Sequence, residues 1–276
     1  MKKPEKPPWL DRKLSFSRTE SFRGKISGVK TVCREARCPN ISECWSRGRA
    51  TFLILGKVCT RGCRFCNMRK GRPGPPDPSE PGRIARTVRT LGVKHAVLTS
   101  PTRDDLEDGG ASYFAEASGI LREFCSVEVL IPDFAGNREA VMSVAESGPH
   151  IVGHNIETVE RLYRLRTGAS YRRSLEVIRT ASGPGGAVTK SALMLGLGET
   201  RDEVIRVMDD LLDAGCLRLS LGQYLRPGLR NYPVSEYIRP EVFEEYGSIG
   251  RGMGFEEVTS GLYVRSSYYE GEGENI

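Results

Sequence analysis

The stretch TFLILGKVCTRGCRFC, residues 51–66, joins an apolar run to three closely spaced cysteines. Cys59, Cys63 and Cys66 follow the pattern CxxxCxxC, which supplies three thiolates from one short loop. Three thiolates leave one iron of a four-iron cluster without a cysteine ligand, whereas a cluster that only carries electrons is usually closed by a fourth cysteine. Hard nitrogen and oxygen donors of a substrate or cofactor can chelate such an open iron. The loop therefore predicts an iron–sulfur cluster that takes part in chemistry.

A second triplet, Cys33, Cys38 and Cys44, lies just before this stretch and predicts a second, separate cluster. Structural zinc is the first alternative, but it normally uses paired CxxC knuckles or Cys/His sets of four ligands, which neither triplet provides. Disulfides are the second alternative, and they require an oxidising compartment. The leftover Cys125 and Cys216 stand alone, and the usual role of such a cysteine is that of a small buried hydrophobe.

The formal charge of +6 is unevenly placed along the 276 residues. Residues 1–50 hold 13 Lys/Arg and 5 Asp/Glu, a net of +8, so residues 51–276 carry −2. The basic segment has no RNA-binding signature, and we expect no nucleic-acid partner. An acidic protein partner is compatible with it, and a solvated surface is the ordinary alternative. If an acidic partner binds there, charge reversal at Lys25, Lys30 and Arg37 should weaken binding in a salt-dependent way.

The sequence predicts neither export nor a membrane span. No run of about 18 apolar residues occurs, so we expect no transmembrane helix and no membrane partner. Residues 1–12, MKKPEKPPWLDR, lack the apolar segment and cleavage site of a secretory signal and are not an Arg/Ser-rich transit peptide. Because exposed clusters need a reducing environment, we expect a cytoplasmic location.

Short β-rich runs alternate with segments of helical period from residue 51 onward. The candidate strands are Thr51–Leu55, Ala96–Thr99, Val127–Ile131, Ile151–Asn155, Ser191–Leu197 and Leu217–Leu221. The candidate helices between them are Arg83–Leu91, Ala111–Phe124, Arg138–Glu146, Val159–Leu165 continuing through Arg172–Thr180, and Arg201–Ala214. This alternation predicts a parallel α/β fold, barrel-like or doubly wound, with its chemistry at the carboxyl ends of the strands. The CxxxCxxC motif begins four residues after Leu55, at such an end.

At this point the motifs carry a resemblance that spans nearly the whole chain. A CxxxCxxC loop after the first strand of a six-fold βα repeat resembles the radical S-adenosylmethionine (SAM) enzymes, and the remaining motifs resemble the lipoyl synthase family within them. Those motifs are KPPWLDRKL, CREARCPNISECW, CTRGCRFCNM, TSPTRDDLEDGG, VEVLIPDF, HNIETVERLY, KSALMLGLGET, GQYLRP and VRSSY. The resemblance implies a partial (β/α)6 TIM-like barrel over residues 51–226. Residues 1–50 and 227–276 would be extensions that carry and cover an auxiliary cluster.

The resemblance also implies an activity. Cys59, Cys63 and Cys66 would hold a [4Fe–4S] cluster whose open iron binds SAM, and reductive cleavage of SAM would give a 5′-deoxyadenosyl radical. Such a radical can abstract hydrogen from the unactivated C6 and C8 positions of an octanoyl-lysine on a lipoyl carrier protein. The auxiliary [4Fe–4S] cluster, on the first triplet, would donate the two sulfur atoms.

The family resemblance places a serine as the fourth ligand of the auxiliary cluster. In the RSSY motif here that serine is Ser267, with Ser266 as the fallback. A hard oxygen donor matches iron in a sulfur-rich cluster poorly, so this corner should open readily when the cluster is dismantled. The ordinary alternative for two serines near a C-terminus is a solvated turn. After VRSSY the family usually continues with His and Ala, whereas here Tyr269 begins an acidic, glycine-rich tail that we expect to be disordered.

Several single residues resemble the family's SAM contacts. The candidates are Thr99, Ser100, Asn155, Glu157, Gly196 and Gly198. Arg103 and Arg166 are weaker candidates for carboxylate or substrate contacts, and His154 is placed to orient the HNIET loop. Helix caps or surface ion pairs are the alternative for each of them. The acidic run at residues 104–108 resembles a metal site, but its most frequent role would be to cap the helix that begins near Gly110.

The expected partners are an octanoylated carrier of the lipoyl-domain or glycine-cleavage H-protein type, a low-potential electron donor, and an iron–sulfur carrier for cluster repair. Two other functions stay open. The first is a different radical SAM enzyme that inserts sulfur elsewhere, which should lack the auxiliary triplet and RSSY. The second is a non-enzymatic iron–sulfur protein that carries electrons or senses oxygen, which should not cleave SAM.

Overall fold

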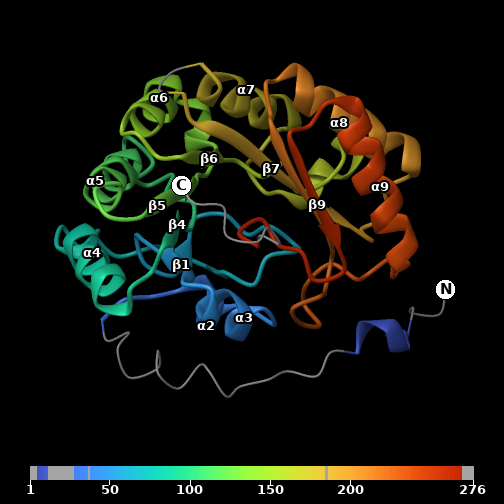
Figure 1. The fold of residues 1–276 in the computed structure, drawn as a ribbon, viewed down its shortest axis with the longest axis horizontal. Coiled ribbons are helices and arrows are strands. Elements are labelled where there is room, and N and C mark those ends of the chain that lie inside the picture. The colour runs from blue at the N-terminus through green and yellow to red at the C-terminus, as the bar shows by residue number, and fades with distance from the viewer. Residues whose placement is uncertain (1–4, 12–27, 37, 184–185, 269–276) are drawn as a thin grey trace.

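The computed structural model describes residues 5–11, 28–36, 38–183 and 186–268. Its main feature is a curved sheet in which all seven strands run parallel, in the order β1-β4-β5-β6-β7-β8-β9 (Figure 1). The strands are β1 (Arg49–Leu53), β4 (His95–Thr99), β5 (Ser126–Leu130), β6 (Ile151–Gly153), β7 (Val188–Leu195), β8 (Arg218–Gln223) and β9 (Glu257–Gly261). Sequential strands that pair in parallel need crossover connections, which helices provide.

Helices cover the outer side of this sheet, and its concave side faces the interior (Figure 1). They are α4 (Glu80–Leu91), α5 (Ala111–Leu121), α6 (Arg138–Glu146), α7 (Tyr171–Ala181), α8 (Arg201–Asp213) and α9 (Pro240–Met253). Alternation along each strand decides which side chains face which side. In β4, Ala96 and Leu98 pack into the core under the helices, whereas Val97 lines an inner pocket together with cysteines. The interior of the curved sheet is therefore where a site can form.

The expected α/β fold of the partial (β/α)6 barrel type is confirmed. Each predicted strand overlaps an observed one, and α6 has the predicted bounds. Two predictions were wrong in detail. Residues Glu160–Leu165 form the 3-10 helix η3 rather than the first part of an α-helix. A seventh strand, β9, pairs with β8 although it lies within the predicted C-terminal extension. The division into residues 1–50, 51–226 and 227–276 stays a prediction.

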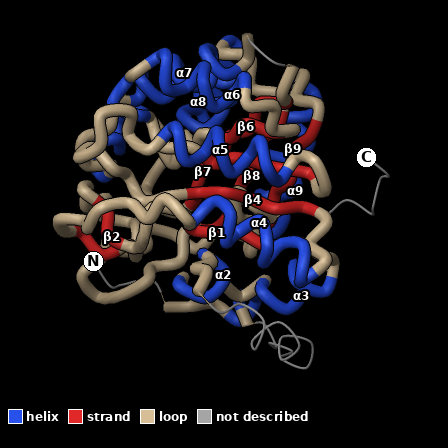
Figure 2. Tube along the Cα trace, turned by 90° about the vertical axis from the view of Figure 1, so that its left-hand side faces the viewer, coloured by secondary structure: helices blue, strands red, loops and turns tan. Residues whose placement is uncertain are grey.

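Short elements flank the barrel. The two-residue strands β2 (Val58–Cys59) and β3 (Arg69–Lys70) pair in parallel and project from one end of the sheet (Figure 2). Helices α2 (Val32–Glu35) and α3 (Ile41–Ser46) lie below β1, on the open side of the barrel (Figure 1). The 3-10 helix η1 (Pro8–Leu10) precedes them. Lys25, Arg37 and the tail after Tyr268 lie outside the described residues. No described helix has the length and apolar character that crossing a bilayer requires.

Candidate functional site

The first cysteine triplet gathers in one pocket, which we call the auxiliary pocket. Cys33 lies on α2, Cys44 lies on α3, and Cys38 lies between them, where its backbone N–H donates to the Cys33 carbonyl at 3.0 Å. Arg265 and Ser267 of the RSSY segment line the same pocket. Burial, together with the charges of Cys38 and Cys33, raises the pKa of the Cys44 thiol to about 12. Three thiols and one hydroxyl from the two ends of the chain thus share one small space.

Hydrogen bonds hold the C-terminal segment against the cysteine helices. The side-chain amide of Asn40 donates to the Tyr263 carbonyl at 2.7 Å, and the Tyr268 hydroxyl donates to Glu43 Oε1 at 3.0 Å. The Tyr263 hydroxyl donates to the carbonyl of Leu10, which is fully buried. These contacts bracket the RSSY segment on both sides and fix its position over the auxiliary pocket.

The two adjacent serines point into different pockets. Ser267 lines the auxiliary pocket, whereas the Ser266 hydroxyl donates to Asn155 Oδ1 at 2.7 Å. Asn155 and Ser266 line a second, central pocket. Arg265 lines both pockets, and burial lowers the pKa of its guanidinium. The geometry is thus consistent with Ser267, and not Ser266, as the hydroxyl that faces the cysteines, although its role as a ligand stays a prediction.

The second triplet lies in the loop after β1, where the strand-end rule places it. The Cys59 carbonyl accepts from Gly71 N–H at 3.0 Å, and the Cys63 carbonyl accepts from Cys66 N–H at 3.1 Å. Two sulfur atoms, Cys59 Sγ and Cys66 Sγ, each accept from the backbone N–H two residues later at 3.4 Å. Burial raises the pKa of Cys66 to about 11 and also raises that of Cys63. Because thiolates are the metal ligands, metal binding at this loop must release protons.

The geometry argues against the zinc alternative. Among the described residues, no three His, Cys, Asp or Glu side chains gather closely enough to hold one metal ion. Thiolates on one zinc lie within about 4.6 Å of each other, because a Zn–S bond is about 2.3 Å long. The acidic run at residues 104–108 forms no metal site either, since Asp108 caps α5 by accepting from Gly110 N–H and Ser112 N–H, both at 2.8 Å.

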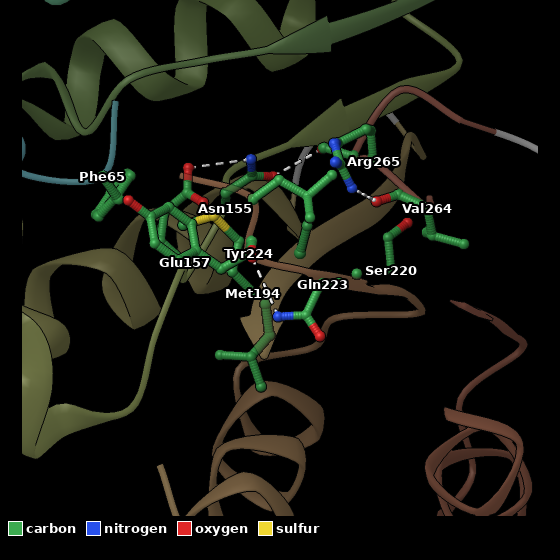
Figure 3. A pocket seen from close by; sticks show the side chains of 14 residues that line it. Phe65, Asn155, Glu157, Met194, Ser220, Gln223, Tyr224, Val264 and Arg265 are labelled. Atoms are coloured by element: carbon green, nitrogen blue, oxygen red, sulfur yellow. Dashed lines mark hydrogen bonds between the residues drawn. The ribbon is translucent and has the colours of Figure 1, made fainter. Parts of the chain in front are cut away.

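The central pocket lies in the interior of the barrel (Figure 3). Its lining comes from the cysteine loop, the loop after β6, strands β7 and β8 and the RSSY segment, and includes Phe65, Asn155, Glu157, Met194, Ser220, Gln223, Tyr224, Val264, Arg265 and Ser266. Glu157 has a φ of +67°, an uncommon conformation for a residue with a side chain. Burial raises the pKa of Glu157, and the nearby charge of Arg166 and the amide of Asn155 counter this effect. The pocket thus combines an apolar wall with a few convergent polar groups, as small-molecule sites do.

A buried hydrogen-bond network beneath the pocket was not predicted. His154 donates from Nδ1 to a backbone carbonyl at 2.9 Å, so its Nε2 accepts from Ser174 Oγ at 3.0 Å. Ser174 Oγ in turn accepts from the Tyr163 hydroxyl at 2.6 Å. Arg166 Nη1 donates to the Asn155 carbonyl at 2.8 Å. The network fixes the loop that carries Asn155 and Glu157, and only His154 and Arg166 gave any signal in the sequence, through their proximity to HNIET and RLYRLR.

Other predicted contacts lie beside the central pocket rather than in its wall. The Thr99 hydroxyl donates to the Leu130 carbonyl at 2.9 Å, whereas the buried Ser100 hydroxyl has no hydrogen-bond partner among the residues that the structure describes. Arg103 is buried and donates to Asp105 and to the Leu55 carbonyl. Gly196 and Gly198 have φ values of +99° and +108°. A Cβ on Gly196 would lie 2.4 Å from Gln223 Nε2, so close packing of the protein accounts for that glycine without a ligand.

Comparison with known proteins then decides the family. The sequence profile of the Radical SAM superfamily matches residues 53–211. A lipoyl synthase of Geobacter sp. (strain M21) is 50% identical over 270 residues, which cover 96% of this chain and 93% of the relative. A lipoyl synthase of Caldanaerobacter subterraneus is 48% identical over 98% of both chains. This chain belongs to the lipoyl synthase family. The matches cover 93% and 98% of these two relatives, and they include the extensions outside the barrel.

Solved structures support the fold alone. A methylornithine synthase matches with a TM-score of 0.57 at 14% identity, covering 91% of this chain and 83% of that one. Coproporphyrinogen III oxidase from Escherichia coli, a radical SAM enzyme, matches with a TM-score of 0.53 at 13% identity, covering 74% of this chain and 52% of that one. At 14% and 13% identity, these likenesses confirm the partial α/β barrel fold.

Proposed function

We propose that this protein is a lipoyl synthase that inserts two sulfur atoms at C6 and C8 of an octanoyl-lysine on a carrier protein. The observation that carries the proposal is that the central pocket is lined both by Phe65, which lies between Cys63 and Cys66 in the cysteine loop, and by Arg265, which also lines the auxiliary pocket. Membership of the lipoyl synthase family supports it independently. When bound, two [4Fe–4S] clusters and SAM supply a hydrogen-abstracting radical and the sulfur.

We assign Cys59, Cys63 and Cys66 to the SAM-binding cluster and the auxiliary cysteines to the sulfur donor. Three thiolates at each site leave a fourth position, which at the SAM site suits the amino and carboxylate groups of the cofactor. At the auxiliary site Ser267 fills that position. The fit rests on the thiols and hydroxyl that line one pocket, and on burial that raises the pKa of the Cys44 thiol to about 12, so that metal binding there releases a proton.

The polar groups of the central pocket are assigned to SAM. Asn155 and Glu157 offer an amide and a carboxylate from a loop that the buried network holds rigid. Ser100 has a buried hydroxyl that lacks a partner in the described structure, and a bound ligand would satisfy it. Contacts from Thr99, Gly196 and Gly198 stay predictions, since each has a partner or neighbour within the protein.

The reaction needs an octanoylated carrier protein and a reductant. We propose a lipoyl domain or a glycine-cleavage H protein as the carrier, a low-potential donor as the reductant, and an iron–sulfur carrier that rebuilds the consumed cluster. The thiolates of both sites are oxidation-sensitive, because thiolate character and exposure set susceptibility. A reducing compartment such as the cytosol suits them.

The first test is iron and sulfide content after anaerobic reconstitution, where two four-iron clusters give about eight of each per chain. The decisive assay incubates the reduced protein with SAM and an octanoylated carrier and weighs the carrier. A gain of two sulfur atoms supports the proposal. Release of deoxyadenosine without any gain in carrier mass would contradict it in favour of another radical SAM activity, and no SAM cleavage at all would favour an electron carrier.

A further inference from the structure

The loop that carries the second cysteine set is strongly basic. Residues 57–76 hold six Lys/Arg and no Asp/Glu, although residues 51–276 as a whole carry a charge of −2. The net basic excess of the chain lies in its first 50 residues, and acidic residues elsewhere in residues 51–276 cancel this second concentration of positive charge. Net charge alone therefore hides a local positive field, which is the quantity that steers a charged partner.

One of the six cations is used inside the protein. Arg61 is buried and pairs with Asp104 at 2.7 Å and with Asp133 at 2.8 Å, so it holds the cysteine loop against the barrel and is not available to a partner. Arg72 is exposed, but it lies near Asp105, whose pKa is lowered mainly by the hydrogen bond from Arg103 and less by the charge of Arg72. Because of this acidic neighbour, we do not count Arg72 among the cations available to a partner.

The other four cations are exposed, and Arg230 from the loop after β8 joins them. The five side chains are those of Lys57, Arg64, Arg69, Lys70 and Arg230. Within the described ranges, none of the five has a carboxylate within salt-bridge distance. We call this surface, together with Leu229, the cluster-loop face. Leu229 is 84% exposed, the most exposed large hydrophobic residue in the described part of the chain.

Contacts within the protein tie these residues to the three cysteines. Lys70 on β3 pairs with Cys59 on β2, and a Cβ added to Gly62 would lie 2.8 Å from Lys70 Cδ. Arg64 lies between Cys63 and Cys66 in the sequence and stacks over the Tyr232 ring at 5.4 Å.

The loop that carries Leu229 and Arg230 is tied to the same cysteines. The Asn231 side chain donates to the Cys66 carbonyl at 2.8 Å. The cluster-loop face therefore covers the outer side of the proposed SAM-binding site, where β2 projects from the barrel (Figure 2).

We infer that the cluster-loop face is the docking surface for an acidic one-electron donor protein. The inference deepens the proposed function and rests on it for the reducible cluster at Cys59, Cys63 and Cys66. In the step concerned, the donor loses one electron and the cluster gains it. Electron transfer weakens steeply with distance, so a donor must dock close to this set of cysteines, and it has no need to reach the auxiliary set.

The octanoylated carrier is a poorer match for the same face. Its lipid arm must reach the central pocket, whose wall shares Arg265 with the auxiliary pocket, rather than the outer side of one loop. The cluster-loop face instead combines an exposed apolar side chain with surrounding cations, which suits a transient contact with an acidic surface. In such contacts charge sets the association rate and a small apolar centre adds affinity. Weak redox encounters bury little area, so a small patch is sufficient.

The test uses the double charge reversal Lys70→Glu/Arg230→Glu in the reconstituted full-length protein. Arg206→Glu on α8 is the matched control, because it changes an exposed arginine away from this face. The measurement is the rate at which the iron–sulfur absorbance bleaches on mixing with the hydroquinone of a purified acidic flavodoxin, and separately with dithionite. We expect the double variant to be reduced by flavodoxin at least tenfold more slowly at low salt, and the difference to shrink at high salt. The dithionite rate and the control should match the wild type.

Three results would overturn the inference. They are an unchanged rate with flavodoxin, an equal loss with dithionite, or a weaker affinity for the octanoylated carrier at an unchanged rate of flavodoxin reduction. The last would assign the face to the carrier instead. Failure of the proposed function can be told apart from failure of this inference. In that case the wild-type protein would show no SAM-dependent chemistry even though its cluster is reduced.

Discussion

Gly222 offers a direct test of how the C-terminal segment reaches the auxiliary pocket. It lies in β8 and faces the interior, where a Cβ would stand 2.2 Å from the Val264 carbonyl oxygen and 3.4 Å from Arg265 Nη1. Real Cβ contacts essentially never fall below 3.0 Å, so Gly222→Ala must push this carbonyl by about 0.8 Å. The opposing atom is backbone, and it cannot swing away as the end of a side chain could.

The consequence should be concentrated at Ser267, three residues after Val264. Metal–ligand distances tolerate about 0.2 Å, so a shift of about 0.8 Å is too large for the Ser267 oxygen to keep its place. A misplacement of about 1 Å among reacting groups can lower the rate about a hundredfold. This corresponds to an increase of about 2.7 kcal/mol in activation free energy, at about 1.36 kcal/mol per tenfold. We therefore expect Gly222→Ala to lower sulfur insertion between tenfold and a hundredfold. Overpacking should cost about 1–3 kcal/mol of folding stability.

Iron and sulfide counts separate this effect from general damage. In Gly222→Ala the content should fall from about eight toward about four of each per chain, while SAM cleavage continues at the other cluster. Gly119→Ala is the control, because that helical glycine has nothing within 4 Å of its Cβ position and should stay at two clusters. If Gly222→Ala keeps about eight irons and full sulfur insertion, the close approach of β8 to the segment does not position Ser267, and the reasoning fails.

Four further predictions concern the serines, two buried titratable groups and the proposed carrier surface. Ser267→Cys should retain both clusters but insert sulfur more slowly, because iron held by a soft thiolate ligand is released less readily; full turnover of this variant would contradict the prediction. Ser266→Ala should lose only the hydrogen bond to Asn155. Burial lowers the pKa of His154 to about 4, so as pH falls the unfolded chain takes up a proton before the folded protein does. About 3 kcal/mol of folding stability should therefore be lost between pH 6.5 and pH 4, and urea unfolding of His154→Gln should show a stability that depends less on pH over this range. Burial alone would raise the pKa of Asp133, but the hydrogen bond and charge of Arg61 hold it below 3.8. The contribution of Asp133 to folding stability is therefore present above that pH and lost below it, and Asp133→Asn should cost about 3 kcal/mol of stability by urea unfolding at pH 7. Lys30→Glu should weaken binding of an acidic carrier at low salt only, and an unchanged affinity there would count against a carrier surface at the N-terminal segment.

Much of the fold followed from local pattern, because buried parallel strands are continuous apolar runs. The run Val127–Ile131 gave β5 to within one residue, and Asn137, the side-chain cap of α6, marks where that helix begins. Strand β9 escaped because EVTSG, residues 257–261, contains one large apolar residue. It forms because β8 offers an unpaired edge, which is a tertiary cause that a local window does not contain.

The candidate site likewise has parts that the sequence predicted and parts that only the packing of the chain brings together. Cysteine spacing predicted two metal-binding sets, since ligands from one loop must be close in sequence. The Ser174 hydroxyl could not be found, because it lies 20 residues from His154 along the chain and only the packing of α7 brings it to the ring at 3.0 Å. Gly196 was predicted from resemblance as a ligand contact, but Gln223 and the Glu236 carbonyl crowd it from within the protein.

The arrangement of Ser266 and Ser267 suggests how the RSSY segment keeps its position when one of its two proposed contacts is lost. Ser266 and Ser267 are the central residues of a turn, which the Tyr268 N–H closes by donating to the Arg265 carbonyl at 2.8 Å. This turn directs the two adjacent side chains into two different pockets, which a single residue could not serve. When the auxiliary cluster is dismantled, the proposed Ser267 ligand is lost, yet the 2.7 Å hydrogen bond from Ser266 to Asn155 and the 2.7 Å bond from Asn40 to the Tyr263 carbonyl do not depend on it. The segment therefore keeps its place beside the central pocket, so Arg265 continues to separate the two sites while sulfur leaves one of them.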